Sequence, residues 1–149
     1  MKEKELKIVA DKQIPYLKGV LEPHAAIRYS EGNAMTSSVI ADADALLIRT
    51  RTPCNQAFLR DTNVRFIASA TSGTDHVDET YCRQGGIRFR NAPGCNASAV
   101  AQYVSSALMY LLGKEKSSPV DVTLGIIGLG HVGTQVLGMA NALGMGVLI

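Results

Sequence analysis

One glycine pattern in the sequence has spacing suited to a defined chemistry: Gly128-Leu129-Gly130-His131-Val132-Gly133. An apolar run precedes it, a stretch with helical apolar spacing follows, and Val147-Leu148-Ile149 begins a second apolar run. In a strand–loop–helix–strand unit, the first glycine permits a tight turn and the second lets the backbone approach a pyrophosphate. The third lets helix and strand pack closely. Backbone N–H groups and the helix dipole would hold the phosphates. We therefore predict a dinucleotide site formed by these six residues, with an ordinary strand–helix turn as the less favoured alternative.

The glycine pattern alone does not separate NAD from NADP. The acidic residue that binds the adenosine ribose is expected about 20 residues further on, at the end of the second strand. The sequence reaches Ile149 just before that position. NAD is the predicted cofactor, and NADP stays open.

Two other loops carry groups that could bind an acidic substrate. Ala70-Thr71-Ser72-Gly73-Thr74-Asp75 offers three hydroxyls and several backbone donors, which can hold a carboxylate or phosphate without a charged side chain. An ordinary turn in which Asp75 caps the next helix explains the same residues equally well. Arg49-Thr50-Arg51-Thr52-Pro53 could bind a phosphorylated acid, although solvation is the favoured state of Arg51. The candidate substrate residues are Arg49, Thr50, Thr71, Ser72, Gly73 and Thr74.

The cysteines and histidines show no metal-ligand spacing, and no metal is expected. Cys54, Cys82 and Cys95 are expected to be free thiols, and Cys95 a packed thiol, because no histidine lies near it in sequence. His24 and His76 are expected to be surface or hydrogen-bonded histidines. His131 could face the cofactor, but a catalytic role is not expected because pyrophosphate loops lie far from the reacting carbon.

These loops need elements that bring them together. Short apolar strands are expected over 6–10, 25–29, 45–48, 66–69 and 88–90, with helices over 15–21, 55–60, 78–84, 97–112 and 132–143. This alternation favours a mainly parallel sheet covered on both faces. Ligands of such sheets bind beyond the carboxyl ends of the strands, which is where the two substrate-loop candidates lie.

Bulk properties exclude several classes. The 149 residues are 46% hydrophobic and 19% charged, which suits a globular chain. A net charge of +2 with scattered basic residues does not indicate nucleic-acid binding, and no stretch has the length of a membrane span. The apolar run Ile8-Val9-Ala10 is too short for a signal peptide, so a cytoplasmic location is expected.

Four segments together resemble the D-2-hydroxyacid dehydrogenase family. ATSGTDHVD (70–78), NAPGCNASAVAQY (91–103) and GIIGLGHVG (125–133) occur in the family's order and spacing, and Ile48-Arg49-Thr50 adds a substrate-contacting position. The resemblance implies that Thr71, Ser72 and Gly73 bind the substrate carboxylate, that Thr50 with Arg49 contacts substrate, and that Gly128, Gly130 and Gly133 bind NAD. It also implies a homodimer that oxidises a D-2-hydroxy acid. Gly94-Cys95-Asn96, the ATSGTDHVD stretch and Ile48-Arg49-Thr50 suggest a phosphorylated one.

The resemblance also predicts a domain organisation within the α/β class. Residues 1–96 would form a flavodoxin-like substrate domain, 97–113 a crossover helix, 114–121 a linker, and 122–149 the first strand–helix–strand of a Rossmann NAD-binding domain.

Two departures from the family pattern matter. Gln102 stands where the family usually has Glu. The family's catalytic Arg, Glu and His are expected downstream of Ile149, so no catalytic residue is assigned within the chain. A catalytically inactive, truncated fragment is therefore an alternative to an active enzyme, and a non-catalytic NAD-sensing corepressor is a third possibility that no residue favours.

Overall fold

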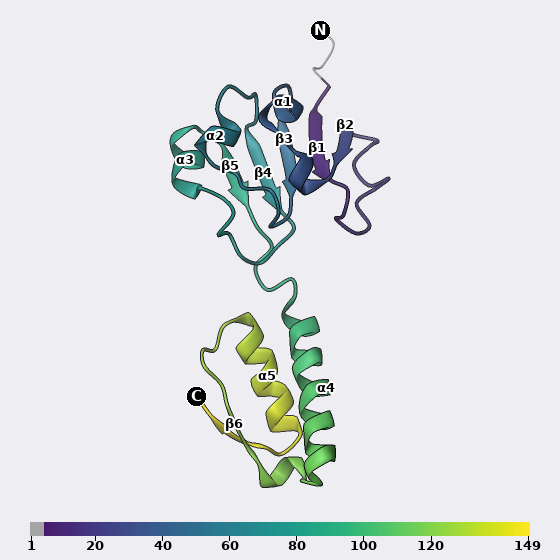
Figure 1. Ribbon diagram of the computed structural model, residues 1–149, viewed down its shortest axis with the longest axis vertical. Helices are drawn as coiled ribbons and strands as arrows, with labels where there is room; N and C mark the ends of the chain where they lie inside the picture. Colours follow the sequence, from purple (N-terminus) through teal and green to yellow (C-terminus); the bar gives the residue numbers. More distant parts are fainter. Residues whose placement is uncertain (1–4) are drawn as a thin grey trace. The chain divides into compact units, whose positions relative to one another are not determined.

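Parallel strands dominate the computed structural model, which describes residues 5–149 and divides into two units, Met1–Ala92 and Pro93–Ile149 (Figure 1). The first unit holds a five-stranded sheet in the order β2-β1-β3-β4-β5. Its strands are β1 (Lys7–Asp11), β2 (Ala26–Ser30), β3 (Ala45–Ile48), β4 (Phe66–Ser69) and β5 (Arg88–Arg90). All neighbouring strands in it are parallel. This strand order is that of flavodoxin-like sheets and confirms the predicted fold class.

Each face of this sheet is buried differently. Val9, Leu46, Ile48 and Ile67 point to the face covered by the short helices α1 (Ser37–Ile40), α2 (Gln56–Leu59) and α3 (Glu79–Gln84). On the opposite face, Ile8, Ala25 and Ala45 form a smaller cluster, with the partly buried Leu21, Ile27 and Leu47 packed against it. The alternation of faces follows the two-residue period of a strand.

The helix expected over 15–21 does not form. Tyr16 has φ +58° and Gly19 has φ +86°, so two residues of the segment adopt the left-handed region that no α-helix can contain. The segment consists of consecutive turns, and the Glu22 carboxylate accepts the Gly19 N–H at 2.8 Å. A 3-10 helix, η1 (Gly32–Ala34), and α1 lie between β2 and β3, where the sequence predicts no helix.

The second unit is a strand–helix–strand motif packed on one long helix. Helix α4 (Ala97–Glu115) is followed by a 3-10 helix, η2 (Pro119–Asp121), β6 (Thr123–Gly125), α5 (His131–Ala142) and β7 (Gly146–Leu148). Strands β6 and β7 are parallel, and α4 lies beside α5 through Ala101 and Val136 (Figure 1). Gly113 lies inside α4, because the left-handed residue that ends the helix is Lys116, with φ +54°.

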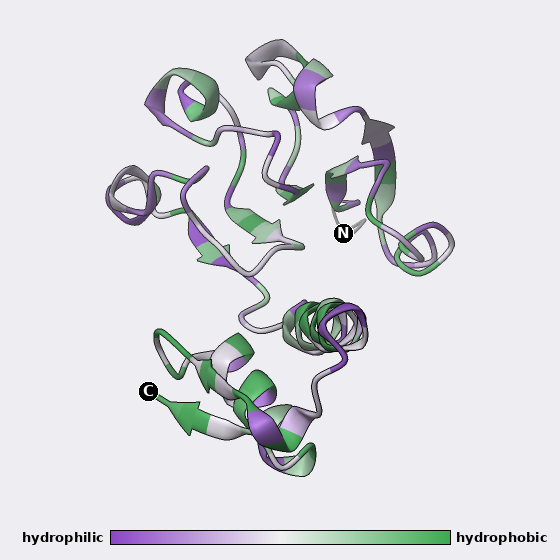
Figure 2. Cartoon of the chain, turned by 60° about the horizontal axis from the view of Figure 1, so that its bottom comes forward, coloured by the Kyte–Doolittle hydropathy of each residue, from purple (hydrophilic) through white to green (hydrophobic). Residues whose placement is uncertain are grey.

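Part of the apolar surface of the second unit stays exposed. Ile126 is buried and Val147 packs against the same cluster, whereas Ile127, Leu148 and Ile149 are exposed. Figure 2 shows the strand that ends at the C-terminus as strongly apolar. Within residues 5–149, no helix has both the length and the apolarity needed to cross a bilayer.

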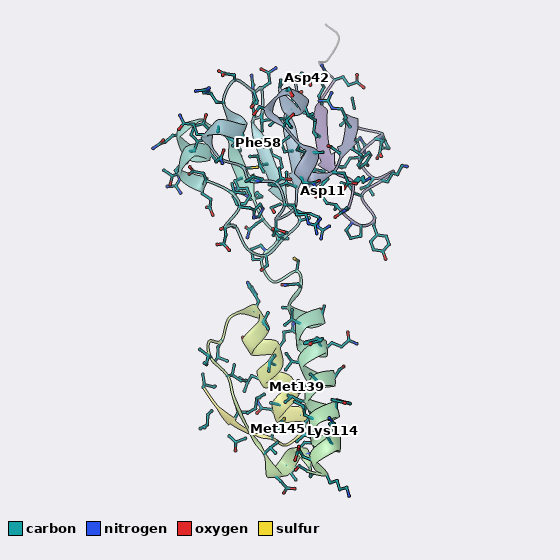
Figure 3. The ribbon with its side chains drawn as sticks, in the orientation of Figure 1. Asp11, Asp42, Phe58, Lys114, Met139 and Met145 are labelled. Carbon is teal, nitrogen blue, oxygen red and sulfur yellow. The ribbon has the colours of Figure 1, made fainter. Side chains whose placement is uncertain are left out.

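An exposed charge cluster ties β1 to β2 at the end of the sheet opposite Asp11 (Figure 3). The Asp42 carboxylate accepts hydrogen bonds from Lys7 Nζ at 2.9 Å and Arg28 Nη2 at 3.0 Å. The hydrogen bond from Lys7, followed by that from Arg28, lowers the pKa of Asp42 to about 2. The same Asp42 contact raises the pKa of Lys7 above 10.5.

This cluster predicts a pH-dependent contribution to stability. A lowered carboxyl pKa stabilises the fold above the ordinary aspartate pKa of 3.8, and the effect is lost as the pH falls towards 2. Asp42→Asn should therefore lower the free energy of unfolding modestly at pH 7 and make no difference near pH 2, as measured by urea titration of both variants. Because the groups are exposed, high salt should also shrink the difference. An effect of equal size at both pH values would contradict this account.

Candidate functional site

The substrate-loop candidates emerge together at the carboxyl edge of the first unit's sheet. Residues 49–53 follow β3, residues 70–75 follow β4, and residues 91–92 follow β5, and these three strands are adjacent and parallel. Parallel pairing therefore brings the loops to one edge, where doubly wound sheets bind ligands.

The loop after β4 has four successive carbonyl groups that accept hydrogen bonds from within the protein. The carbonyl of Thr71 accepts the Ala92 N–H at 3.0 Å, and that of Ser72 accepts Asn91 Nδ2 at 2.7 Å. The carbonyl of Gly73 accepts the Thr71 hydroxyl at 3.1 Å, and that of Thr74 accepts the Val77 N–H at 2.8 Å. Because four successive carbonyl oxygens are engaged by hydrogen bonds within the protein, they repel an approaching anion less, which favours its contact with the N–H groups of the loop. Such an array of N–H groups is the backbone environment that binds carboxylates and phosphates.

Two features of this loop differ from expectation or were not predicted. Asp75 does not cap the following helix, because the N-cap of α3 is Asp78, whose Oδ1 accepts the Tyr81 N–H at 2.9 Å. Asn91 supports the loop through its side chain, a role hidden in the sequence because it depends on the pairing of β4 with β5.

In the loop after β3, the four polar residues lie in different environments. Arg49 is half-buried, and its Nη1 donates to the carbonyl and side-chain oxygens of Gln13 at 3.4 and 3.2 Å. Thr52 is fully buried and donates its hydroxyl to the Gly32 carbonyl at 3.1 Å. Thr50 and Arg51 are exposed. Arg49 and Thr50 thus stay available to a ligand, whereas Thr52 has a structural role.

A buried carboxylate, not singled out from the sequence, lies at the end of β1. Asp11 is 1% exposed, and its Oδ1 accepts the Gln13 N–H at 2.9 Å (Figure 3). A Cβ on Gly32 would lie 2.7 Å from Asp11 Oδ2, so only glycine allows this close approach. Asp11 thereby fixes the backbone of Gln13, the residue that holds the Arg49 guanidinium. The available signal was its place as the polar end of an apolar strand.

The thiols divide by burial. Cys54 and Cys82 are buried, and burial raises the pKa of Cys54 to about 12 and that of Cys82 above 9.0. Neither is suited to nucleophilic chemistry at neutral pH. The prediction that Cys95 is packed is wrong, because this thiol is exposed. Cys95 lies in the turn before α4 and belongs to none of the three apolar clusters of the protein. Across residues 5–149, no group of three or more His, Cys, Asp or Glu is arranged to hold a metal ion.

In the second unit, the three glycines have distinct geometries. Gly128 has φ +88°, which a turn out of β6 requires. A Cβ on Gly133 would lie 2.1 Å from the Gly128 carbonyl oxygen, so helix and turn are in direct backbone contact. Gly130 is the N-cap of α5, has no side-chain cap, and would place a Cβ in open space.

This open space is a hollow of about 400 Å³ at the start of α5, lined by Leu129, Gly130, His131, Thr134 and Gln135. The first N–H groups of a helix have no partner within it, and here no side chain caps them. A diphosphate could therefore accept hydrogen bonds from these N–H groups with the positive end of the helix dipole behind them. The residues present fit a dinucleotide.

His131 packs against the turn that precedes α4. A Cβ on Gly94 would lie 2.8 Å from His131 Cγ, and Gly94 has φ +72°. The Gly94-Cys95-Asn96 turn and the glycine loop are thus in contact within the second unit. Asn96 occupies the N-cap position of α4 but makes no side-chain cap hydrogen bond, and the Gln102 side chain on the same helix is exposed.

The contact between Gly94 and His131 predicts energetic coupling. Gly94→Ala should cost about 1–3 kcal/mol, because alanine resists the left-handed φ and its methyl group clashes with the imidazole. In a His131→Ala background the clash with the imidazole ring is gone, and the φ cost remains together with a milder contact to the Cβ of residue 131 at 3.1 Å. A urea-unfolding double-mutant cycle should therefore give a coupling energy of about 1 kcal/mol. Additivity within about 0.3 kcal/mol would show that the two residues do not interact.

Comparison with known proteins gives the class first. Residues 5–141 match the family model described as D-isomer specific 2-hydroxyacid dehydrogenase, catalytic domain. The chain therefore belongs to this family, which confirms the resemblance inferred from the loops.

Individual relatives narrow the comparison. Erythronate-4-phosphate dehydrogenase of Bacteroides thetaiotaomicron is 47% identical over 146 residues, covering 97% of this chain and 42% of the relative. The enzyme of the same name from Porphyromonas gingivalis is 44% identical over 144 residues, covering 97% and 39%. The chain thus spans about two fifths of the length of these relatives. Among solved structures, NAD⁺-bound 3-phosphoglycerate dehydrogenase of Entamoeba histolytica matches with TM-score 0.77 and 27% identity, covering 97% of this chain and 53% of that one.

Proposed function

We propose that these residues supply the substrate loops and the pyrophosphate loop of an NAD-dependent erythronate-4-phosphate dehydrogenase. The observation that carries the proposal is the identity of 47% with the Bacteroides enzyme across nearly the whole chain. In the reaction, the C2–H of 4-phospho-D-erythronate leaves as hydride, the C2 hydroxyl loses a proton to a base, and the 2-oxo acid forms. NAD, when bound, is the hydride acceptor.

Substrate binding is assigned to two loops. The hydrogen-bonded carbonyls of Thr71, Ser72 and Gly73 support the binding of the substrate carboxylate by the N–H groups of this loop, with the Thr74 hydroxyl beside it. The Arg49 guanidinium carries five N–H donors, and Gln13 accepts hydrogen bonds only from those on Nη1. The N–H groups on Nε and Nη2 can therefore hold the substrate phosphate or a hydroxyl. Thr50, exposed next to Arg49, completes the set.

Cofactor binding is assigned to residues 128–133. The open space at Gly130 and the uncapped start of α5 support the placement of the pyrophosphate there. By family resemblance, a His is the acid–base group, a Glu tunes that His, and an Arg polarises the developing carbonyl. These 149 residues do not include that Arg, Glu and His. We accordingly expect the chain by itself to be inactive. NAD is preferred to NADP on the likeness to the NAD⁺-bound structure.

The domain division follows from the same assignment. Residues 1–96 would form the substrate domain, 97–113 the crossover, 114–121 the linker and 122–149 the start of the NAD-binding domain. Family resemblance also supports a cytoplasmic homodimer that acts in pyridoxal phosphate biosynthesis.

A panel of 2-hydroxy acids tests the substrate assignment. The complete gene product that carries these 149 residues should form NADH from 4-phospho-D-erythronate with a kcat/KM at least about tenfold above that for 3-phosphoglycerate, which lacks one hydroxyl. The ratio should be at least about 100-fold for glycerate, which also lacks the phosphate, because each lost polar contact costs about tenfold. Faster turnover of 3-phosphoglycerate would favour the second candidate, a 3-phosphoglycerate dehydrogenase. The observation that supports this candidate is the 27% identity to the Entamoeba enzyme. Faster reduction of hydroxypyruvate would favour a hydroxypyruvate reductase.

A further inference from the structure

Behind the loop after β4 lies a chain of hydrogen bonds that no substrate contact explains. Ser69, the last residue of β4, is 3% exposed, and its hydroxyl lies 2.6 Å from Thr71 Oγ1 and 2.9 Å from His76 Nε2. Thr71 Oγ1 in turn lies 3.1 Å from the Gly73 carbonyl oxygen. The three side chains therefore connect β4, the loop and the segment that leaves the loop.

Counting protons gives this chain a single direction. The Gly73 carbonyl can only accept, so it takes the one hydroxyl proton of Thr71. Thr71 must then accept from Ser69, which uses the one hydroxyl proton of Ser69. Ser69 has no proton left for the imidazole, so His76 Nε2 has to be the donor of the remaining bond.

Backbone hydrogen bonds hold the main chain from which the imidazole extends. The His76 carbonyl accepts the Cys54 N–H at 2.7 Å, and the next residue, Val77, donates its N–H to the Thr74 carbonyl at 2.8 Å. Burial lowers the pKa of His76 below 6.5, partly opposed by the Asp75 carboxylate, so the ring is neutral at pH 7 and carries one N–H. With that proton on Nε2, Nδ1 is bare.

We infer that His76 and Ser69 are positioning residues: the Nε2–H of His76 begins a one-way chain of hydrogen bonds through Ser69 and Thr71 that holds the Gly73 carbonyl in place. The inference deepens the proposed function, on which it rests, because it names what presents the N–H groups of residues 71–74 to a carboxylate. It also assigns the Thr71 hydroxyl proton to Gly73 rather than to the substrate.

The first test reads the proton directly and needs no activity. In the 149-residue chain labelled with ¹⁵N-histidine, His76 should show a protonated Nε2 and a bare Nδ1 at pH 7, with an Nε2–H resonance protected from solvent exchange. The exposed His24 and His131 serve as internal references and should show no such protected resonance. Ser69→Ala should abolish the protection at His76 alone. A proton on Nδ1, or protection unchanged by Ser69→Ala, would overturn the inference.

The second test separates positioning from general stability in the complete gene product. His76→Leu removes the donor and should raise KM for 4-phospho-D-erythronate about tenfold with little change in kcat or in KM for NAD. His76→Gln keeps an N–H donor at a similar reach and should restore most of the loss. Equal KM values in wild type and His76→Leu would overturn the positioning role. Absence of turnover by the wild type would overturn the proposed function and, with it, the role of His76 in substrate binding. The His76 tautomer and the direction of the hydrogen-bond chain are decided separately by the first test.

Discussion

Gly133→Ala is expected to destabilise the second unit by about 3 kcal/mol or more. The added Cβ would lie 2.1 Å from the Gly128 carbonyl oxygen and 3.1 Å from its carbonyl carbon. Both are backbone atoms, so no side-chain rotation can relieve the clash, and either the turn or α5 has to move. Displacement of a close backbone contact belongs to the severe end of overpacking. Hydrogen-exchange protection of amides in α5 and β6 is the suitable measurement, because the two units need not unfold together.

Gly138→Ala is the matched control for that experiment. Gly138 lies in the same helix, and its added Cβ would meet nothing within 4 Å. Because alanine is the better helix former, this substitution should leave protection unchanged or raise it by up to about 1 kcal/mol. Equal losses in the two variants would show that the close packing of helix and turn does not hold the unit together.

Gly130→Ala is expected to separate folding from cofactor binding. Its Cβ would meet nothing within 4 Å, so the chain should still fold, with a loss of at most about 1 kcal/mol because alanine is a poorer N-cap than glycine. A bound pyrophosphate would, however, need the space that the methyl group fills. We expect the complete gene product to lose about 100-fold in NAD affinity, or about 2.7 kcal/mol, as measured by calorimetry.

Gly113→Ala is the matched control for binding. Gly113 also has open space at its Cβ position, but it lies in α4 near the end of that helix and away from the glycine pattern in sequence. NAD affinity should match that of wild type. If Gly130→Ala bound NAD as tightly as Gly113→Ala, the pyrophosphate would not lie at the start of α5.

Local patterns predicted much of the fold because they encode burial directly. The apolar runs at 45–48 and 66–69 became β3 and β4 with their predicted bounds, since buried parallel strands need little beyond hydrophobicity and turns at both ends. The helix at 15–21 was wrong because its apolar spacing says nothing about the left-handed backbone at Tyr16 and Gly19. The helix expected over 97–112 extends to Glu115, because a glycine inside a helix costs only about 1 kcal/mol and the left-handed residue that ends α4 is Lys116.

The candidate site was only partly visible in the sequence for a related reason. Ligand-facing loops have conspicuous compositions, such as Thr71-Ser72-Gly73-Thr74, but the residues that hold them act across strands. Asn91 reaches Ser72 only because β5 pairs with β4, and Asp11 is buried against Gly32 only because β1 lies inside the sheet. One usable signal remains: Asp11 and Ser69 are both polar residues that end otherwise apolar strands, where a buried polar group must have a partner.

Isotope transfer tests the central claim most directly. The complete gene product, supplied with 4-phospho-D-erythronate deuterated at C2 and with unlabelled NAD, should produce NADH that carries one deuterium, detected by mass spectrometry, together with the 2-oxo acid. That result requires substrate and NAD to be bound side by side with direct hydride transfer between them. Unlabelled NADH, or release of the deuterium to water, would contradict the assignment of these loops to a hydride-transferring dehydrogenase of this substrate.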